Sequence, residues 1–132
     1  MSKLKKALTI FALICGLIGL IGFWGVSLIL DGMCGNDIVL KKVSPDNKHN
    51  VFVFNRDCGA TTGFSTQISI LDDDEELDNE SGNLFISEGY PSNVIVKWVD
   101  SHTLEITGTG GRIFKKEKTY LEIKILYPEY VE

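Results

Sequence analysis

The chain has 132 residues, which suits one modest domain and is too short for two. Its charge is uneven: residues 1–34 carry three lysines and one aspartate, whereas residues 35–132 carry 10 basic and 17 acidic residues. This acidic part argues against binding to nucleic acid and against flat docking on an anionic lipid surface, because both need clustered lysine or arginine. A hydrophobic content of 44% and a charged content of 23% exclude wholesale disorder.

An apolar stretch of 24 residues without a formal charge fills residues 7–30. As a helix it measures about 36 Å, enough to cross a hydrocarbon core of about 30 Å. Lys3, Lys5 and Lys6 precede it, and positive charge stays on the cytoplasmic side of a membrane. The sequence therefore predicts three parts: a cytoplasmic tail over 1–6, a single transmembrane anchor in the lipid bilayer over 7–30, and an extracytoplasmic domain (periplasmic or extracellular) over 35–132.

A cleaved signal peptide is the alternative interpretation of this stretch. The apolar region of a signal peptide is usually about 7–15 residues long and ends at a small-x-small cleavage site. The stretch here is longer, and no Ala-x-Ala follows it. An uncleaved anchor at the cell membrane is therefore the favoured prediction.

Short strands separated by turn signals are expected after the anchor. The first two expected strands, over 38–43 and 51–54, flank the turn sequence Ser-Pro-Asp-Asn at 44–47. The second is apolar on both faces, which predicts a central strand. A third expected strand over 67–71 alternates, with Ile68 and Ile70 inward and Gln67 and Ser69 outward.

The second half of the domain continues the pattern. A short strand is expected over 83–87, and strands over 94–99 and 103–107 form a predicted hairpin through Asp-Ser-His. The glycine-rich residues 108–111 break the chain before a final strand over 118–127, with Leu121, Ile123, Ile125 and Tyr127 inward. Six or seven such strands and no amphipathic helix predict an all-β antiparallel domain, either a sandwich or an open barrel.

Three cysteines occur in the chain. Cys15 lies in the apolar stretch, whereas Cys34 and Cys58 lie in the predicted outer domain, where disulfides form. A bridge between these two is the favoured interpretation. A nucleophilic Cys58 is the alternative, but it needs a base, and His49 and His102 have no recognisable catalytic spacing with it.

The most distinctive stretch runs from Arg56 to Gln67 and combines a charge pair, two glycines and several hydroxyl side chains. It follows Cys-Gly-Asn at 34–36 and Ser-Pro-Asp at 44–46, and it precedes Val-Lys-Trp at 96–98. With these segments the chain resembles a bacterial family of small membrane-anchored proteins classed only as a domain of unknown function. The resemblance implies an anchor with a small domain and the cysteine pair, and it implies no activity.

The same stretch has two physical interpretations. As structure, its glycines permit tight turns, its threonines satisfy loop backbone groups, and Arg56 pairs with Asp57 or another acid. As function, a loop made rigid by a disulfide presents Arg56, Asp57, Thr61 and Thr62 as a candidate recognition surface.

The remaining polar residues give no pattern typical of a metal or cofactor site. The acidic run over 72–80 lacks the glycine and glutamate that a Ca²⁺ loop of the EF-hand type requires, so a solvated hairpin tip is expected. His49 and His102 have no third ligand at metal-like spacing and are expected to be exposed loop residues.

A binding or interaction module of the cell envelope is the leading functional hypothesis, with an envelope protein or ligand as partner and no cofactor or metal. A membrane-anchored inhibitor or immunity-type protein is the first alternative. An enzyme with an unrecognised site is the second, although neither Gly-x-Ser-x-Gly nor His-Glu-x-x-His occurs.

Overall fold

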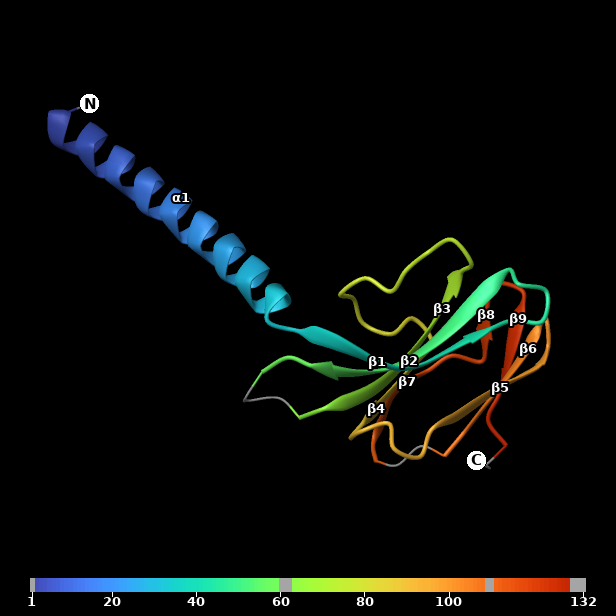
Figure 1. Ribbon diagram of the computed structural model, residues 1–132. Coiled ribbons are helices and arrows are strands. Elements are labelled where there is room, and N and C mark those ends of the chain that lie inside the picture. The colour runs from blue at the N-terminus through green and yellow to red at the C-terminus, as the bar shows by residue number, and fades with distance from the viewer. Residues whose placement is uncertain (1, 60–62, 109–110, 129–132) are drawn as a thin grey trace. The chain divides into compact units, whose positions relative to one another are not determined.

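The chain divides into two compact units, Met1–Met33 and Cys34–Glu132, each described here by itself. The structure is a computed structural model that describes residues 2–59, 63–108 and 111–128. In Figure 1 the first unit is the long helix and the second is the group of strands.

The first unit is the helix α1 (Lys3–Gly32). Its part from Lys3 to Ile29 has a mean hydropathy of 2.3, and none of that span is buried by protein. An apolar helix with no protein around it needs another apolar environment, and at about 1.5 Å per residue it is long enough to cross a bilayer. The helix is thus long and apolar enough to be the expected membrane span.

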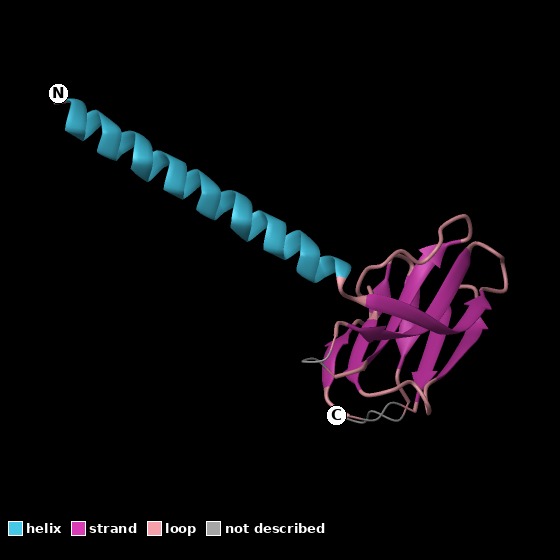
Figure 2. Ribbon diagram, turned by 60° about the vertical axis from the view of Figure 1, so that its left-hand side comes forward, coloured by secondary structure: helices cyan, strands magenta, loops and turns pink. Residues whose placement is uncertain are grey.

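The second unit is built from strands. In the part of the chain that the structure describes, nine strands occur: β1 (Gly35–Val43), β2 (His49–Asp57), β3 (Ser65–Asp72), β4 (Phe85–Glu88), β5 (Ile95–Asp100), β6 (Thr103–Thr107), β7 (Ile113–Lys116), β8 (Thr119–Tyr120) and β9 (Ile123–Leu126). They form one sheet of order β1-β2-β3-β4-β7 and a second of order β5-β6-β9-β8. Figure 2 shows these strands in magenta and the helix in cyan.

The two sheets share one hydrophobic core. The first sheet contributes side chains such as Val53, Ile68 and Phe85, and the second contributes Leu104 and Ile123, all almost fully buried. Burial of apolar side chains from two sheets against one another is the arrangement of a β-sandwich. The sandwich alternative of the sequence prediction therefore describes this unit.

The strand count and the pairing differ from the prediction. Nine strands replace the expected six or seven, and β6 pairs with β9 in parallel, through Leu104 and Ile125 for example, so the second sheet is mixed and not purely antiparallel. The strand β7 was not predicted, because Ile113–Lys116 has no apolar alternation. It completes the first sheet by pairing with β4.

The final strand is broken in two. Leu121 has a backbone φ of 50°, in the left-handed region, and it turns the chain between β8 and β9. The prediction that Leu121 faces inward is wrong, because the turn leaves its side chain 75% exposed. Ile123 and Ile125 are buried as predicted.

Gln67 and Ser69 of β3 are buried, so the prediction that they face solvent is wrong. The chain after β3 folds back over that face. The backbone N–H of Gly82 donates to Gln67 Oε1 at 2.6 Å, and the N–H of Asn83 donates to Ser69 Oγ at 3.1 Å. A Cβ at Gly82 would lie 2.9 Å from the Ile68 carbonyl oxygen, so only glycine fits this close approach.

Candidate functional site

A disulfide joins Cys34 to Cys58, with an S–S distance of 2.08 Å. Gly35, the first residue of β1, pairs with Asp57, the last residue of β2, so the bridge closes the end of this hairpin. The predicted bridge is confirmed. Because the sulfur of Cys58 is bonded to Cys34, the alternative of a nucleophilic Cys58 is not supported.

Arg56 is held within the domain, next to the disulfide. Its Nη1 donates to Asn36 Oδ1 at 2.7 Å and to Asn79 Oδ1 at 3.0 Å. Asn79 Nδ2 in turn donates to the Cys34 carbonyl oxygen at 2.6 Å, and Asn36 Nδ2 donates to the Glu80 carbonyl oxygen at 2.8 Å. This network fastens the acidic segment to β1 and β2. The expected pairing of Arg56 with an acidic side chain is replaced by bonds to two amide oxygens.

The candidate recognition loop is described only in part. Asp57 Oδ1 accepts a hydrogen bond from the N–H of Gly59 at 3.0 Å, which shapes the turn after β2. Thr61 and Thr62 lie outside the described residues. At the far side of the loop, the exposed ring of Phe64 meets that of Tyr90 edge-on, with centroids 5.6 Å apart. Recognition by this loop stays a prediction.

The acidic run over 72–80 does not form a metal site in the structure. Within residues 2–59, 63–108 and 111–128, no group of three or more His, Cys, Asp or Glu side chains is placed to hold a metal ion. The acidic side chains of Asp73, Asp74 and Glu76 are exposed to solvent, as expected. The backbone, however, is fixed to the sheet through Asn36 and Gly82, which the sequence did not predict.

Three turns meet at the end of the sandwich opposite the disulfide and enclose a cavity of about 420 Å³. We call it the turn-end cavity. It is lined by residues from the β1–β2, β5–β6 and β8–β9 turns: Asp46, Lys48, His49, His102, Leu121, Glu122 and Ile123. Both histidines of the chain thus line one cavity, although they are 53 positions apart in the sequence.

The β1–β2 turn at this cavity is held by side-chain hydrogen bonds. Ser44 Oγ donates to Asp46 Oδ1 at 2.6 Å and accepts from the N–H of His49 at 3.0 Å, and Asn47 takes a positive φ of 59°. The bond from Ser44 lowers the pKa of the Asp46 carboxyl below its usual 3.8, and the N–H of Lys48 adds to this effect. The predicted turn at 44–47 is confirmed.

His49 is partly enclosed beside this turn. Its Nε2 lies 3.5 Å from Asp72 Oδ1, and its Nδ1 is buried with no hydrogen-bond partner among the described residues. The prediction of an exposed loop histidine holds for His102 and is wrong for His49, whose side chain is 20% exposed.

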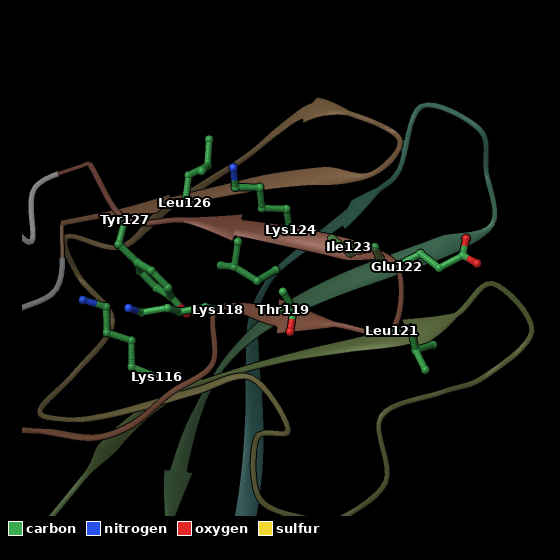
Figure 3. Close-up of a pocket in the computed structure, with 10 residues that line it drawn as sticks. Lys116, Lys118, Thr119, Leu121, Glu122, Ile123, Lys124, Leu126 and Tyr127 are labelled. Carbon is green, nitrogen blue, oxygen red and sulfur yellow. The ribbon is translucent and has the colours of Figure 1, made fainter.

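A second, larger cavity of about 590 Å³ opens beside β8 and β9. We call it the lysine groove, after Lys116, Lys118 and Lys124, which line it together with Leu126 and Tyr127. Figure 3 shows Lys116 and Lys118 extending toward the same end of the groove, next to the Tyr127 ring.

The groove is asymmetric along its length. Lys116 Nζ lies 4.8 Å from the centroid of the Tyr127 ring, and the Tyr127 hydroxyl donates to the Glu117 carbonyl oxygen at 2.6 Å. Glu122 extends toward the other end, where Leu121 also lies (Figure 3). The lysine groove therefore offers positive charge and an aromatic ring at one end, and an apolar side chain with a carboxylate at the other.

A protein-family model described as a family of unknown function, DUF5412, matches residues 2–120. The chain belongs to this family. The match covers α1 and the strands from β1 to β8. No curated protein and no solved structure matches the chain.

Neither the lysine groove nor the turn-end cavity of this DUF5412 member was predicted from the sequence. The lysine groove could have been suspected from the density of basic residues after position 111, five in 13 residues of an otherwise acidic domain. The turn-end cavity has no such signal, because three distant turns form it. Leu121 lines both cavities, and its positive φ is a conformation that its residue type does not predict.

Proposed function

We propose that this protein is a membrane-anchored binding module whose β-sandwich lies outside the cytoplasm and captures its partner at the turn-end cavity. The binding role rests on one observation: three turns meet around charged side chains of both signs and the apolar side chains of Leu121 and Ile123. Loops on a rigid scaffold that combine such groups are frequent binding sites.

Two features support the proposed location. The lysines before α1 favour a cytoplasmic N-terminus, and the helix is apolar enough to span a bilayer. The disulfide between Cys34 and Cys58 fits an oxidising compartment, because cytosolic proteins are usually kept reduced.

The position of the cavity supports the proposed role. β1 begins at Gly35, directly after the residue that joins this unit to the first, and it runs nine residues before the turn that lines the cavity. At about 3.3 Å per residue, the cavity lies about 30 Å along the sandwich from that junction. The disulfide and the cavity therefore lie at opposite ends of the β1–β2 hairpin, which leaves the three turns of the cavity uncovered by the bridge.

Crosslinking in intact cells tests the proposal. A photocrosslinking amino acid is placed at His102, an exposed residue of the cavity, and in a second variant at Lys97, an exposed β5 residue that lines neither cavity. We expect a defined adduct from position 102 and none from position 97, both variants being present at equal levels in the membrane.

Equal crosslinking from both positions, or none from position 102, contradicts the proposal. Mass spectrometry of the adduct separates the narrower alternatives: a captured toxin or lytic enzyme indicates the inhibitor or immunity role. An adduct with a small-molecule substrate that the protein then converts indicates the enzyme.

A further inference from the structure

We infer that the lysine groove is a separate binding site for an organic phosphate, with the phosphate held by Lys116 and Lys118 and the body of the ligand lying along the Tyr127 ring. The site differs from the turn-end cavity in its chemistry, because Lys116 at the end of β7 and Lys118 just before β8 take the place of the histidines. The inference does not depend on the proposed function.

Charge in the domain is segregated, and the groove lies in its most basic part. Residues 112–124 hold five of the ten basic residues of 35–132: Arg112, Lys115, Lys116, Lys118 and Lys124. Only two acids, Glu117 and Glu122, accompany them, although 35–132 has 17 acids in all. A groove lined by three lysines attracts anions.

The two lysines that extend toward the same end of the groove are positioned by the fold (Figure 3). Lys116 is held over the Tyr127 ring, whose hydroxyl is bonded to the Glu117 carbonyl oxygen. The Lys118 carbonyl oxygen accepts from the N–H of Ile125 at 2.9 Å, which fixes the backbone of Lys118 against β9. The contact with the Tyr127 ring restricts the Lys116 side chain, and the backbone bond sets where the Lys118 side chain begins.

The charge and the shape of the groove select the ligand class. A phosphate monoester carries a charge of about −1.5 to −2 near pH 7, which matches two ammonium groups at one end, whereas a carboxylate supplies one charge. Lysines act on such a group as point charges, without the planar fork of arginine. The Tyr127 ring offers apolar surface to whatever the phosphate is attached to, and the volume of about 590 Å³ fits a small molecule.

Calorimetric titration of the full chain in phosphatidylcholine nanodiscs tests the inference, with three probes. Phenyl phosphate has two charges and a ring, inorganic phosphate has the charges alone, and benzoate has the ring with one charge. We expect phenyl phosphate to bind most tightly, and added salt to weaken its binding. The double variant Lys116→Gln with Lys118→Gln should weaken it at least about tenfold, consistent with a loss of about 1.4 kcal/mol.

The matched control is Lys97→Gln, which removes one exposed lysine of β5 and should leave phenyl phosphate binding unchanged. If the double variant does not fold, judged by circular dichroism, Lys118→Gln alone replaces it, since Lys116 is the lysine that packs on Tyr127.

Three results overturn the inference: no saturable binding of phenyl phosphate, binding of benzoate as tight as that of phenyl phosphate, or an equal loss of affinity in Lys97→Gln. A fourth probe, the synthetic peptide of residues 72–80, tests whether the groove binds an acidic protein segment in place of an organic phosphate. If this acidic peptide binds the groove more tightly than phenyl phosphate, the groove receives the acidic segment of a second copy, and the organic phosphate is excluded.

Discussion

Asp46 shows how one side chain fixes a turn. Its carboxylate accepts from Ser44 Oγ and from the N–H of Lys48, and these bonds favour the ionised form. The pKa of Asp46 is therefore lower in the folded chain than its usual 3.8. A group with a lowered pKa stabilises the fold above its unfolded value, and that contribution is lost as the pH falls through the folded value.

A carboxyl ¹³C NMR titration measures this shift. We expect the Asp46 midpoint below 3.8 in the wild-type chain. Ser44→Ala removes the strongest cause and should raise the Asp46 midpoint toward 3.8. Equal midpoints for Asp46 in the two proteins would show that the Ser44 bond does not form.

At the scale of elements, the end of β2 and the loop that follows it contain residues of two kinds. Arg56 donates to Asn36 and Asn79, so Arg56→Ala should lower the melting temperature by about 5 °C or more, for a loss of about 1 kcal/mol.

If the loop after β2 recognises a partner, Thr61→Ala with Thr62→Ala should weaken partner capture and leave the melting temperature nearly unchanged. A large drop in melting temperature in the threonine variant would make these residues structural.

The disulfide acts on the first hairpin as a whole. Closing a loop of 25 residues, both cysteines included, stabilises a domain by about 3.5 kcal/mol in the chain-entropy treatment. Cys58→Ser should therefore lower the melting temperature by about 10–20 °C, measured by circular dichroism at equal protein concentration. Thiol labelling of the native, unreduced protein should find neither Cys34 nor Cys58 reactive. Labelling of both would contradict the bridge.

Elements were predictable where their signals are local. The strand β6 lies at Thr103–Thr107 as predicted, because Leu104 and Ile106 alternate with polar residues directly after a turn. The burial of Gln67 and Ser69 was not predictable from alternation, since it depends on a segment some 15 residues further along the chain. The parallel pairing of β6 with β9 is likewise set by the packing of distant segments.

At the scale of the whole molecule, the cysteines of the disulfide and the histidines of the turn-end cavity come from segments far apart in the sequence. The disulfide could be expected from the number and location of the cysteines, and it is present. The turn-end cavity could not, because His49 and His102 meet only when the β1–β2 and β5–β6 turns lie at the same end of the sandwich. Sequence periodicity defines faces of strands, but it does not define which turns become neighbours.

The proposed function depends on the side of the membrane on which residues 35–132 lie. A reporter that is active only outside the cytoplasm, fused after Glu132, measures this directly, with a cytoplasm-active reporter at the same position as the control. The account predicts activity of the first reporter alone, because Lys3, Lys5 and Lys6 precede the apolar helix. Activity of the cytoplasmic reporter alone would contradict it.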